Sequence, residues 1–474
     1  MNRSRMPGFI RVVPFGVIVA LLALSSTSAG QSKPLSSWQQ LARGILEELI
    51  NINTTDSVGS TTKAAEAMAA RLRAAGFPAD DIQVLGPNPR KGNLVARLHG
   101  TGQRKPLLLL AHLDVVEALR EDWSFDPFKF LEKDGYFYGR GTADDKAMAA
   151  IWVANLIRFK QEKFNPDRDI IVALTADEEG GNSNGVSWLL QNHRNLIDAE
   201  YCFNEGGGGL IKKGKYLLNE VQASEKVYLS FNLEVRNRGG HSSLPTKDNA
   251  IYRLAEGLNR LARYEFPAHL DEITRAYFAR SAALETGQTA ADMKAVTLTP
   301  PDAAAVARLS QVPLYNALMR TTWVATRLAG GHADNALPQT ARALVNCRIL
   351  PGESADEVEQ TLINVLADKQ ISVARMGSPK PSPASPLKPE IMKPIEQITA
   401  QMWPGVFVIP TMCTGGTDGL YLRNAGIPTY GISGIFEDMG EVRAHGKDER
   451  IGMKSFFEGQ DFLYRLMKAV SSQN

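Results

Sequence analysis

Apolar residues follow two different spacings in the first half of the chain. From Trp38, and again over 62–75 and 147–159, they recur every three or four residues, which predicts helices. Runs that are apolar throughout predict buried strands, at 93–98, 106–111 and 170–175. Strands that are apolar on both faces and alternate with helices are typical of an α/β fold. We therefore expect a mainly parallel sheet with helices on both faces.

The pattern changes near Glu225. Residues 227–235 and 341–349 alternate between apolar and polar, which predicts strands with one exposed face. Residues 249–263 return to helical spacing. These elements predict an inserted α+β domain, in which helices cover one face of a separate sheet.

The chain returns to α/β character near its end. Residues 377–389 are rich in Pro and Ser and indicate a crossing between domains, and a helix is predicted at 390–401, with strands near Val406 and Thr429. The length of 474 residues also exceeds the usual size of one core. The expected layout is an α/β domain in two parts, 30–224 and 377–474, split by an inserted domain at 225–376.

The N-terminus has the composition of a secretory signal peptide. Arg3, Arg5 and Arg11 precede or border an apolar run at 15–24, and small residues lead to Ala29. A membrane anchor is the alternative, but the run is shorter than the ~20 apolar residues that span a bilayer. We expect residues 1–29 to be removed, which predicts a secreted or periplasmic protein with no membrane association after cleavage.

Composition excludes several other functions. Lys and Arg are scattered among acidic residues and the formal net charge is +2, so nucleic acid is not an expected partner. The three cysteines, Cys202, Cys347 and Cys413, are too few for a disulfide scaffold, and we expect buried free thiols. Because no C-x-x-C motif is present, any metal must be held by His and carboxylate groups.

The strand at 106–111 leads directly into a candidate ligand. His112 and Asp114 follow it, at the carboxyl end of a strand where open α/β sheets place their ligands. Side chains two residues apart point the same way in extended chain, so the Asp114 carboxylate can orient the imidazole from behind. By itself the H-x-D pair favours an ordinary capped or hydrogen-bonded surface histidine over a metal ligand.

Two runs of acidic residues follow further along the chain. Asp144 and Asp145 precede an apolar helix, where they can bind metal or simply cap the helix N-terminus. The run Asp177, Glu178 and Glu179 directly follows a predicted buried strand. Adjacent carboxylates repel one another, so this run indicates either a metal site or a solvated turn. Chemistry alone does not choose between Asp144 and Asp145.

Two more segments complete the candidate chemistry. Glu205 ends an apolar run and precedes four glycines, but the Leu and Ile that follow do not fit a phosphate-binding loop. Late in the chain, His445 lies in the segment His-Gly-Lys-Asp-Glu, which ends at Glu449.

The order of these motifs resembles the zinc-dependent exopeptidases of metallopeptidase family M20, which include aminoacylases, desuccinylases, glutamate carboxypeptidases and carnosinase-like enzymes. The resemblance covers essentially the whole chain after residue 29, including Gly-Gly-His-Ser-Ser at 239–243, Asn-Ala-Leu-Pro at 335–338 and Gly-Gly-Thr-Asp-Gly at 415–419. It implies a zinc exopeptidase fold with an inserted lid, which also forms a homodimer. One departure is Asp448 before Glu449, where the family often has Asn, which suggests a more acidic rim.

The resemblance also implies a role for each motif residue. It implies two zinc ions, or Mn²⁺ or Co²⁺ in their place, with His112 and Glu205 on one, Glu179 and His445 on the other, and Asp144 bridging both. Glu178 is then the general base, with Asp114 behind His112, and His241 stabilises the oxyanion across the dimer interface. Asn335, Arg348 and the backbone amides of Gly415, Gly416 and Thr417 are expected to bind the substrate carboxylate.

The expected function is hydrolysis of a peptide bond next to a free α-carboxylate, by an exported dipeptidase or carboxypeptidase. An Ala-rich stretch at 280–313 lengthens the lid, as in carboxypeptidase-like and carnosinase-like members, which favours peptide substrates. The alternative within the same chemistry is an N-acyl-amino-acid amidohydrolase. The alternative from another class is a binding protein that has lost catalysis, although every expected ligand position is filled.

Overall fold

The computed structural model describes residues 34–380, 382–441 and 443–472. The expected signal peptide lies outside these residues and stays a prediction. Within the described part of the chain, no helix combines the length and the apolar character needed to cross a membrane.

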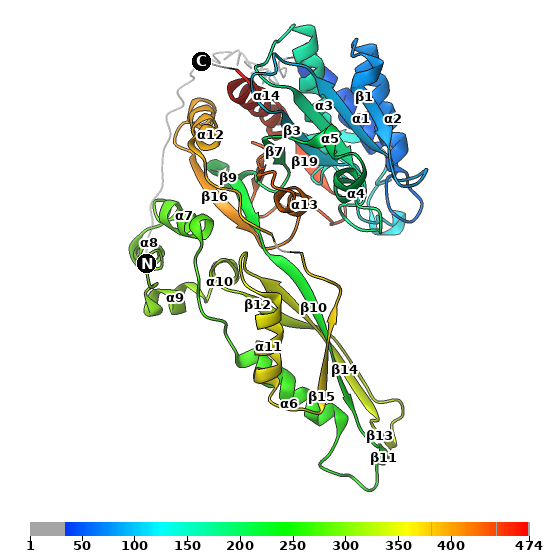
Figure 1. Cartoon of the computed structure of the whole chain (residues 1–474), viewed down its shortest axis with the longest axis vertical. Helices are drawn as coiled ribbons and strands as arrows, with labels where there is room; N and C mark the ends of the chain where they lie inside the picture. The colour runs from blue at the N-terminus through cyan, green and yellow to red at the C-terminus, as the bar shows by residue number, and fades with distance from the viewer. Residues whose placement is uncertain (1–33, 381, 442, 473–474) are drawn as a thin grey trace, which may run out of the picture. The chain divides into compact units, whose positions relative to one another are not determined.

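A ten-stranded sheet is the centre of the α/β region (Figure 1), with the order β1-β2-β6-β3-β7-β17-β9-β8-β18 and β16 paired with β9. The strands are β1 (Ile82–Leu85), β2 (Asn93–Leu98), β3 (Leu107–His112), β6 (Ile170–Thr175), β7 (Tyr201–Asn204), β8 (Gly209–Lys212), β9 (Lys215–Glu225), β16 (Phe407–Cys413), β17 (Thr429–Gly431) and β18 (Phe436–Asp438). The neighbours β6, β3, β7 and β17 run parallel, whereas β1 and β2 form an antiparallel edge. The predicted mainly parallel sheet is confirmed.

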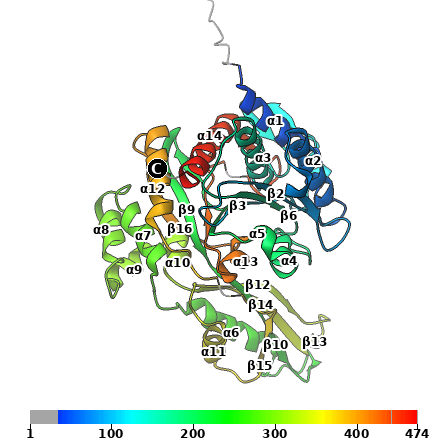
Figure 2. The same cartoon turned by 45° about the horizontal axis from the view of Figure 1, so that its top comes forward.

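Helices cover both faces of this sheet (Figure 2). One side carries α1 (Ser37–Ile50), α2 (Thr61–Ala74), α3 (Lys146–Gln161) and α14 (Met453–Val470), with α12 (Pro389–Met402) packed on α14; the other carries α4 (Gly185–Asn192), α5 (Arg194–Ile197) and α13 (Gly419–Asn424). Leu108 and Leu110 of β3 pack with α4 and α13, whereas the Trp152 indole of α3 donates to the Leu110 carbonyl from the opposite side. Because both faces are covered, these strands are apolar throughout.

A separate four-stranded antiparallel sheet lies in the predicted insert, with the order β12-β14-β10-β15. Its strands are β10 (Val227–Arg236), β12 (Thr322–Gly330), β14 (Thr340–Ile349) and β15 (Ile371–Met376), and its helices are α6 (Ala250–Arg263) and α11 (Ala355–Leu366). Leu229, Phe231 and Leu233 alternate with polar residues and share a core with both helices, which explains the period of two. A short hairpin-like pair, β11 (Gly240–His241) and β13 (Ala336–Leu337), adjoins this sheet.

Four helices lie in and beside the Ala-rich stretch at 280–313: α7 (Glu272–Ser281), α8 (Gly287–Ala295), α9 (Ala303–Leu309) and α10 (Pro313–Met319). Their core includes Phe278 and Met293 together with Ile409 of β16 and Leu218 of β9. The Arg280 guanidinium also donates to the Val408 carbonyl, over 2.9 Å. This part of the insert therefore packs on the α/β sheet, while the limits 225–376 for one lid domain stay a prediction.

Smaller elements complete the described chain. They are a three-stranded sheet of β4 (Leu131–Lys133), β5 (Tyr136–Tyr138) and β19 (Arg450–Gly452), and the 3₁₀ turns Ala79–Asp81 and Arg120–Asp122. All three cysteines are unpaired, as expected. Cys202 and Cys347 are buried, whereas the expectation of burial is wrong for Cys413, which is half-buried.

Candidate functional site

His112 ends β3 and is buried, so it is not a surface histidine. Its Nδ1 lies 2.9 Å from the backbone carbonyl oxygen of Asp114. A carbonyl only accepts, so Nδ1 donates, and Nε2 is left to face Asp144. The Asp114 carboxylate was expected in this role, but its Oδ1 is 3.7 Å from Nδ1. The same residue therefore orients the ring through its main chain.

Asp144 lies between two histidines that come from opposite ends of the sequence. Its Oδ1 is 2.9 Å from His112 Nε2, and its Oδ2 is 3.1 Å from His445 Nε2. Each histidine also has a second acid nearby: Glu205 Oε2 is 3.7 Å from His112 Nε2, and Glu179 Oε1 is 2.7 Å from His445 Nε2. The five predicted ligands are thus brought together as two sets that share Asp144.

Asp145 is placed differently from its neighbour. It occupies the N-cap of α3 but makes no capping hydrogen bond with its side chain. Ligand atoms of His112, Asp145 and Glu205 lie within 4.8 Å of one another, as do those of His112, Asp144 and Glu179. Only Asp144 contacts both histidines, so the geometry favours Asp144 for a bridging position.

The carboxylates at this site are crowded and their protonation is strongly perturbed. Burial and the charge of Asp144 raise the pKa of Glu179 to about 7, and burial and Glu205 raise the pKa of Glu178 to about 10. Burial also acts on Asp144, but hydrogen bonds from His112 and His445 hold its pKa below the ordinary value. Acids that repel one another around inward-facing imidazole nitrogens form a donor set that fits divalent cations.

The carboxylate of Asp114 holds the two glutamates that follow β6. It is buried, and it accepts hydrogen bonds from the amide of Glu178, over 3.1 Å, and from the amide of Glu179, over 3.0 Å. Burial raises the pKa of Asp114, and these amides oppose the shift. Asp114 therefore fixes the backbone that presents both side chains to the site.

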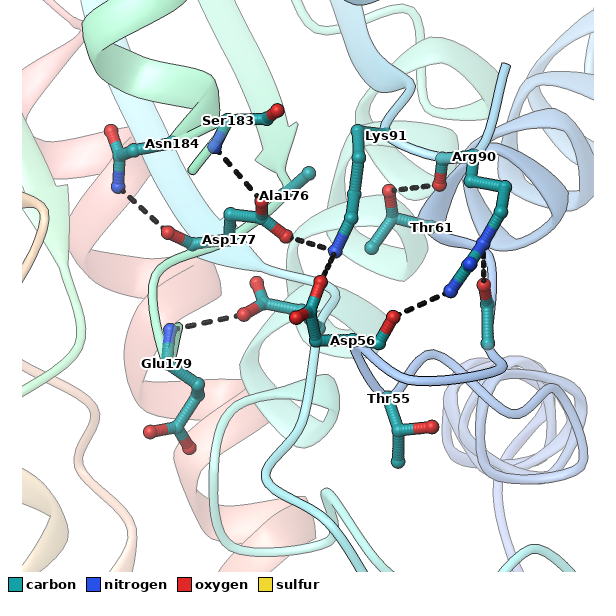
Figure 3. Close-up of polar contacts among 12 residues, drawn as sticks. Thr55, Asp56, Thr61, Arg90, Lys91, Ala176, Asp177, Glu179, Ser183 and Asn184 are labelled. Carbon is teal, nitrogen blue, oxygen red and sulfur yellow. Dashed lines mark hydrogen bonds and ion pairs between the residues drawn. The ribbon is translucent and has the colours of Figure 1, made fainter. Parts of the chain in front are cut away.

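Asp177 begins the acidic run and is anchored by Lys91 (Figure 3). The Lys91 ammonium lies between the Asp177 carboxylate, which it contacts closely, and Asp56 Oδ1, at 2.6 Å. The other Asp177 oxygen accepts the Ser183 amide over 3.0 Å. Asp177 is 4% exposed, so the solvated-turn interpretation of this residue is wrong. Sequence reasoning missed Lys91, because it lies 86 residues before its partner.

Glu449 was expected on an acidic rim, but it is fully buried. Its Oε1 accepts the backbone amides of Gly141, over 3.1 Å, Ala143, over 2.7 Å, and Asp144, over 3.2 Å. Its Oε2 pairs with Arg140 Nη1 at 2.6 Å. Glu449 therefore holds the loop that carries Asp144, and it lies four residues after His445. Glu449 therefore connects the loop of Asp144 to the segment that carries His445.

The predicted lid residues form two groups. His241 is exposed, its Nδ1 accepts the Ser243 amide over 3.1 Å, and the Asn335 carbonyl accepts the Ser242 amide over 3.0 Å, so His241 and Asn335 are neighbours. Arg348 lies on β14, with its guanidinium 4.8 Å from the centre of the Tyr228 ring. Among the described residues, the hydrogen bonds of His241 and Asn335 stay within the insert and do not reach the cluster around Asp144.

The Gly-Gly-Thr segment is already hydrogen-bonded at two of its three predicted amides. The Gly415 amide donates to Cys413 Sγ over 3.2 Å, and the Thr417 amide donates to Glu225 Oε2 over 3.1 Å. Within the described chain, Gly416 alone of the three has an amide without such a contact. Of the three backbone amides expected to bind the substrate carboxylate, only the Gly416 amide is therefore available in this arrangement.

Comparison with protein families gives one match over most of the chain. The model of peptidase family M20/M25/M40 matches residues 108–469. The human protein called N-fatty-acyl-amino acid synthase/hydrolase PM20D1 is 30% identical over 380 residues, covering 77% of this chain and 74% of that protein. The probable carboxypeptidase S-like 2 of Dictyostelium discoideum is also 30% identical, covering 77% of this chain and 71% of its own.

Solved structures share the fold at lower identity. An M20 family metallo-carboxypeptidase from Sulfolobus solfataricus has a TM-score of 0.69 at 16% identity and covers 91% of this chain and 99% of its own. Human carnosine dipeptidase 1 has a TM-score of 0.59 at 15% identity and covers 93% and 100%. A dinuclear metal-binding M20 peptidase from Bacillus subtilis has a TM-score of 0.58 at 10% identity and covers 91% and 98%.

Proposed function

Because this chain belongs to peptidase family M20/M25/M40, whose members hydrolyse peptide or amide bonds, we propose that it is an exported two-metal exopeptidase. Its substrate carries a free α-carboxylate next to the bond that is cleaved. The observation that supports this most directly is the position of Asp144, with one carboxylate oxygen at His112 and the other at His445. Export rests on the sequence of residues 1–29 alone.

The metal ligands in this proposal form two sets. His112 and Glu205 would hold one ion, His445 and Glu179 would hold the other, and Asp144 would offer one carboxylate oxygen to each. Oxygen and imidazole nitrogen donors suit zinc, and Mn²⁺ or Co²⁺ can use the same donors. Two such ions, when bound, lower the pKa of a shared water and polarise the scissile carbonyl.

Glu178 is the general base of the proposed reaction. Asp114 accepts a hydrogen bond from the Glu178 backbone amide, and the half-buried Glu178 carboxyl lies near Glu205 and His112. Added positive charge at the neighbouring ligands lowers the raised pKa of this carboxyl, so that it can take a proton from water. The water oxygen adds to the scissile carbonyl carbon, and Glu178 then passes the proton to the leaving nitrogen as the C–N bond breaks.

The lid supplies the substrate contacts, with a second copy of the chain taking part. Arg348 offers a planar fork suited to the α-carboxylate, and Asn335 and the Gly416 amide offer further hydrogen bonds. His241 is exposed on its own protomer, which suits a role at the oxyanion of a partner. The edge strand β12 is exposed along most of its length and carries Val324 and Leu328, so we place the homodimer contact there.

A substrate panel on zinc-loaded protein tests the proposal. Dipeptides and longer peptides with a free C-terminus should be cleaved, while C-terminally amidated copies should be cleaved far more slowly. Preferred cleavage of N-acyl amino acids over peptides would favour the amidohydrolase alternative, which the similarity to PM20D1 supports. Glu178→Gln protein, loaded with the same metal, is the matched control for contaminating peptidases. Equal rates for free and amidated peptides would contradict the carboxylate requirement.

A further inference from the structure

A cavity of about 260 Å³ extends from the candidate metal ligands into the α/β region. It starts at Asp144 and Glu205 and runs along the glycine segment 206–209. Met148, Leu210, Ile435 and Ile451 give it apolar walls. None of the described residues that line it belongs to the insert. The proposed carboxylate contacts, which are Arg348, Asn335 and the Gly416 amide, are also absent from its lining, so we assign this cavity to the acyl side of the scissile bond.

Acidic side chains without partners line the same cavity. Glu220 of β9 and Glu437 of β18 are half-buried, and among the described residues their carboxylates make no hydrogen bond or ion pair. Asp145 is only 4% exposed, and its Oδ2 has no hydrogen-bond partner. Lys, Arg and His are all missing from the described lining. Carboxylates that are partly or fully buried without a partner are costly, so a cation that enters this space is favoured.

The cation has to be extended rather than a single metal ion. Within the described chain, Glu220 and Glu437 do not belong to any group of three ligand atoms close enough to hold an ion. They lie on strands separated by β8, where Glu437 is opposite Leu210 and Glu220 is beside Gly208. At the usual strand spacing and rise per residue, this register places their backbones roughly 11–12 Å apart. An alkyl chain along the apolar walls, ending in a cationic group between these carboxylates, matches this layout. A fatty acyl chain would leave both acids unpaired.

We propose that this cavity binds a basic side chain, an alkylammonium or alkylguanidinium, on the acyl side of the cleaved bond. The inference rests on the proposed exopeptidase function and specifies its substrate class. Glu220 and Glu437 are the specificity-determining residues, and Leu210, which lies between their strands, contacts the methylene stem.

The experiment compares substrates that differ only by the terminal cation. Lys-Phe is set against norleucine-Phe, and the Nα-acetyl forms of both are included so that the comparison holds for a dipeptidase or a carboxypeptidase. In zinc-loaded protein the lysine substrate should have a kcat/KM at least about tenfold higher, a difference of about 1.4 kcal/mol. Glu220→Gln with Glu437→Gln should bring this ratio close to one, whereas Asp438→Asn, next on β18 but outside the cavity lining, should keep it.

A measurement of binding without turnover separates the cavity assignment from the proposed exopeptidase function. Calorimetry on zinc-loaded Glu178→Gln protein, which lacks the proposed base, should show that Nα-acetyl-lysine binds more tightly than Nα-acetyl-norleucine. The double variant in the same background should lose this difference. Equal values for the two ligands, or a double variant that weakens both alike, would overturn the cavity assignment even if peptides are cleaved. If no peptide is cleaved but the lysine preference in binding remains, the exopeptidase function fails and the cavity assignment stands.

Discussion

Replacing Glu449 with Gln is expected to damage the metal site without touching a proposed ligand. The substitution keeps the size of the side chain but supplies only one oxygen, where the carboxylate serves three backbone amides and Arg140. Whichever way the amide is turned, its NH₂ group faces a donor. Arg140 is 3% exposed, so it loses its charge partner inside the protein.

The size of the effect follows from this burial. Breaking a buried ion pair by removing one partner costs about 3–5 kcal/mol, because the remaining charge is uncompensated. Loosening the Asp144 loop should also weaken metal binding by about 10–100-fold, as is usual for groups that orient metal ligands. Asp448→Asn is the matched control, because among the described residues its carboxylate accepts only from Ser124, in a contact that is open to solvent.

Two assays measure these effects separately. Urea unfolding of metal-free Glu449→Gln protein should give a lower midpoint with an unchanged m-value, and competition with a chromogenic chelator should give the weaker zinc affinity. The Asp448→Asn control should stay within about 1 kcal/mol of the parent protein in stability. If Glu449→Gln matched the parent protein in both assays, the inference that Glu449 holds the Asp144 loop would be refuted.

Four further changes have defined outcomes. Glu178→Gln should lower kcat by about 10²–10⁴-fold while metal analysis still finds two ions, and a near-normal kcat would exclude it as the base. Lys91→Met should lower kcat by about 10²-fold through displacement of the Glu178 backbone, and Lys91→Arg should recover most of this; equal loss in both would indicate a general folding defect. Burial raises the pKa of Glu220 to about 7 in the folded protein, whereas in the unfolded chain it is ~4.3. The folded protein therefore keeps a proton that the unfolded chain releases, and the free energy of unfolding falls as the pH rises from ~4.3 to about 7. Glu220→Gln should therefore increase the free energy of unfolding above pH 7 and leave it unchanged below pH ~4, measured by denaturation across pH. Chelation should abolish hydrolysis and two equivalents of zinc per chain should restore it, whereas full recovery with one equivalent would contradict the paired site.

Much of the fold could be predicted because the burial of each strand face determines the pattern of apolar residues in the sequence. Strands β2 and β6 match the apolar runs at 93–98 and 170–175, since both faces of these strands are buried. The alternating pattern of β10 was equally clear, because only one of its faces packs on α6 and α11. The packing of α7–α10 on the α/β sheet was not predicted, because an Ala-rich stretch has too few large apolar residues to indicate its partner.

The candidate site was predictable in its ligands but not in the contacts that hold them. Motif order identified His112, Asp144 and Glu179, whereas chemistry alone left Asp144 and Asp145 equivalent. Only the three-dimensional placement of His445 at Asp144 Oδ2 separates the two. Lys91 and Glu449 act on loops 86 and 308 residues away, and no local pattern carries that information. The burial of Glu449 was not predicted for the same reason.

The central claim is a metal pair bridged by Asp144, and anomalous diffraction tests it most directly. Crystals of zinc-loaded protein, measured on both sides of the zinc absorption edge, should show two peaks about 3.5–4 Å apart. One peak should lie between His112 and Glu205, the other between His445 and Glu179, with one Asp144 oxygen at each. A single peak, or a pair bridged by Asp145 instead, would contradict the account.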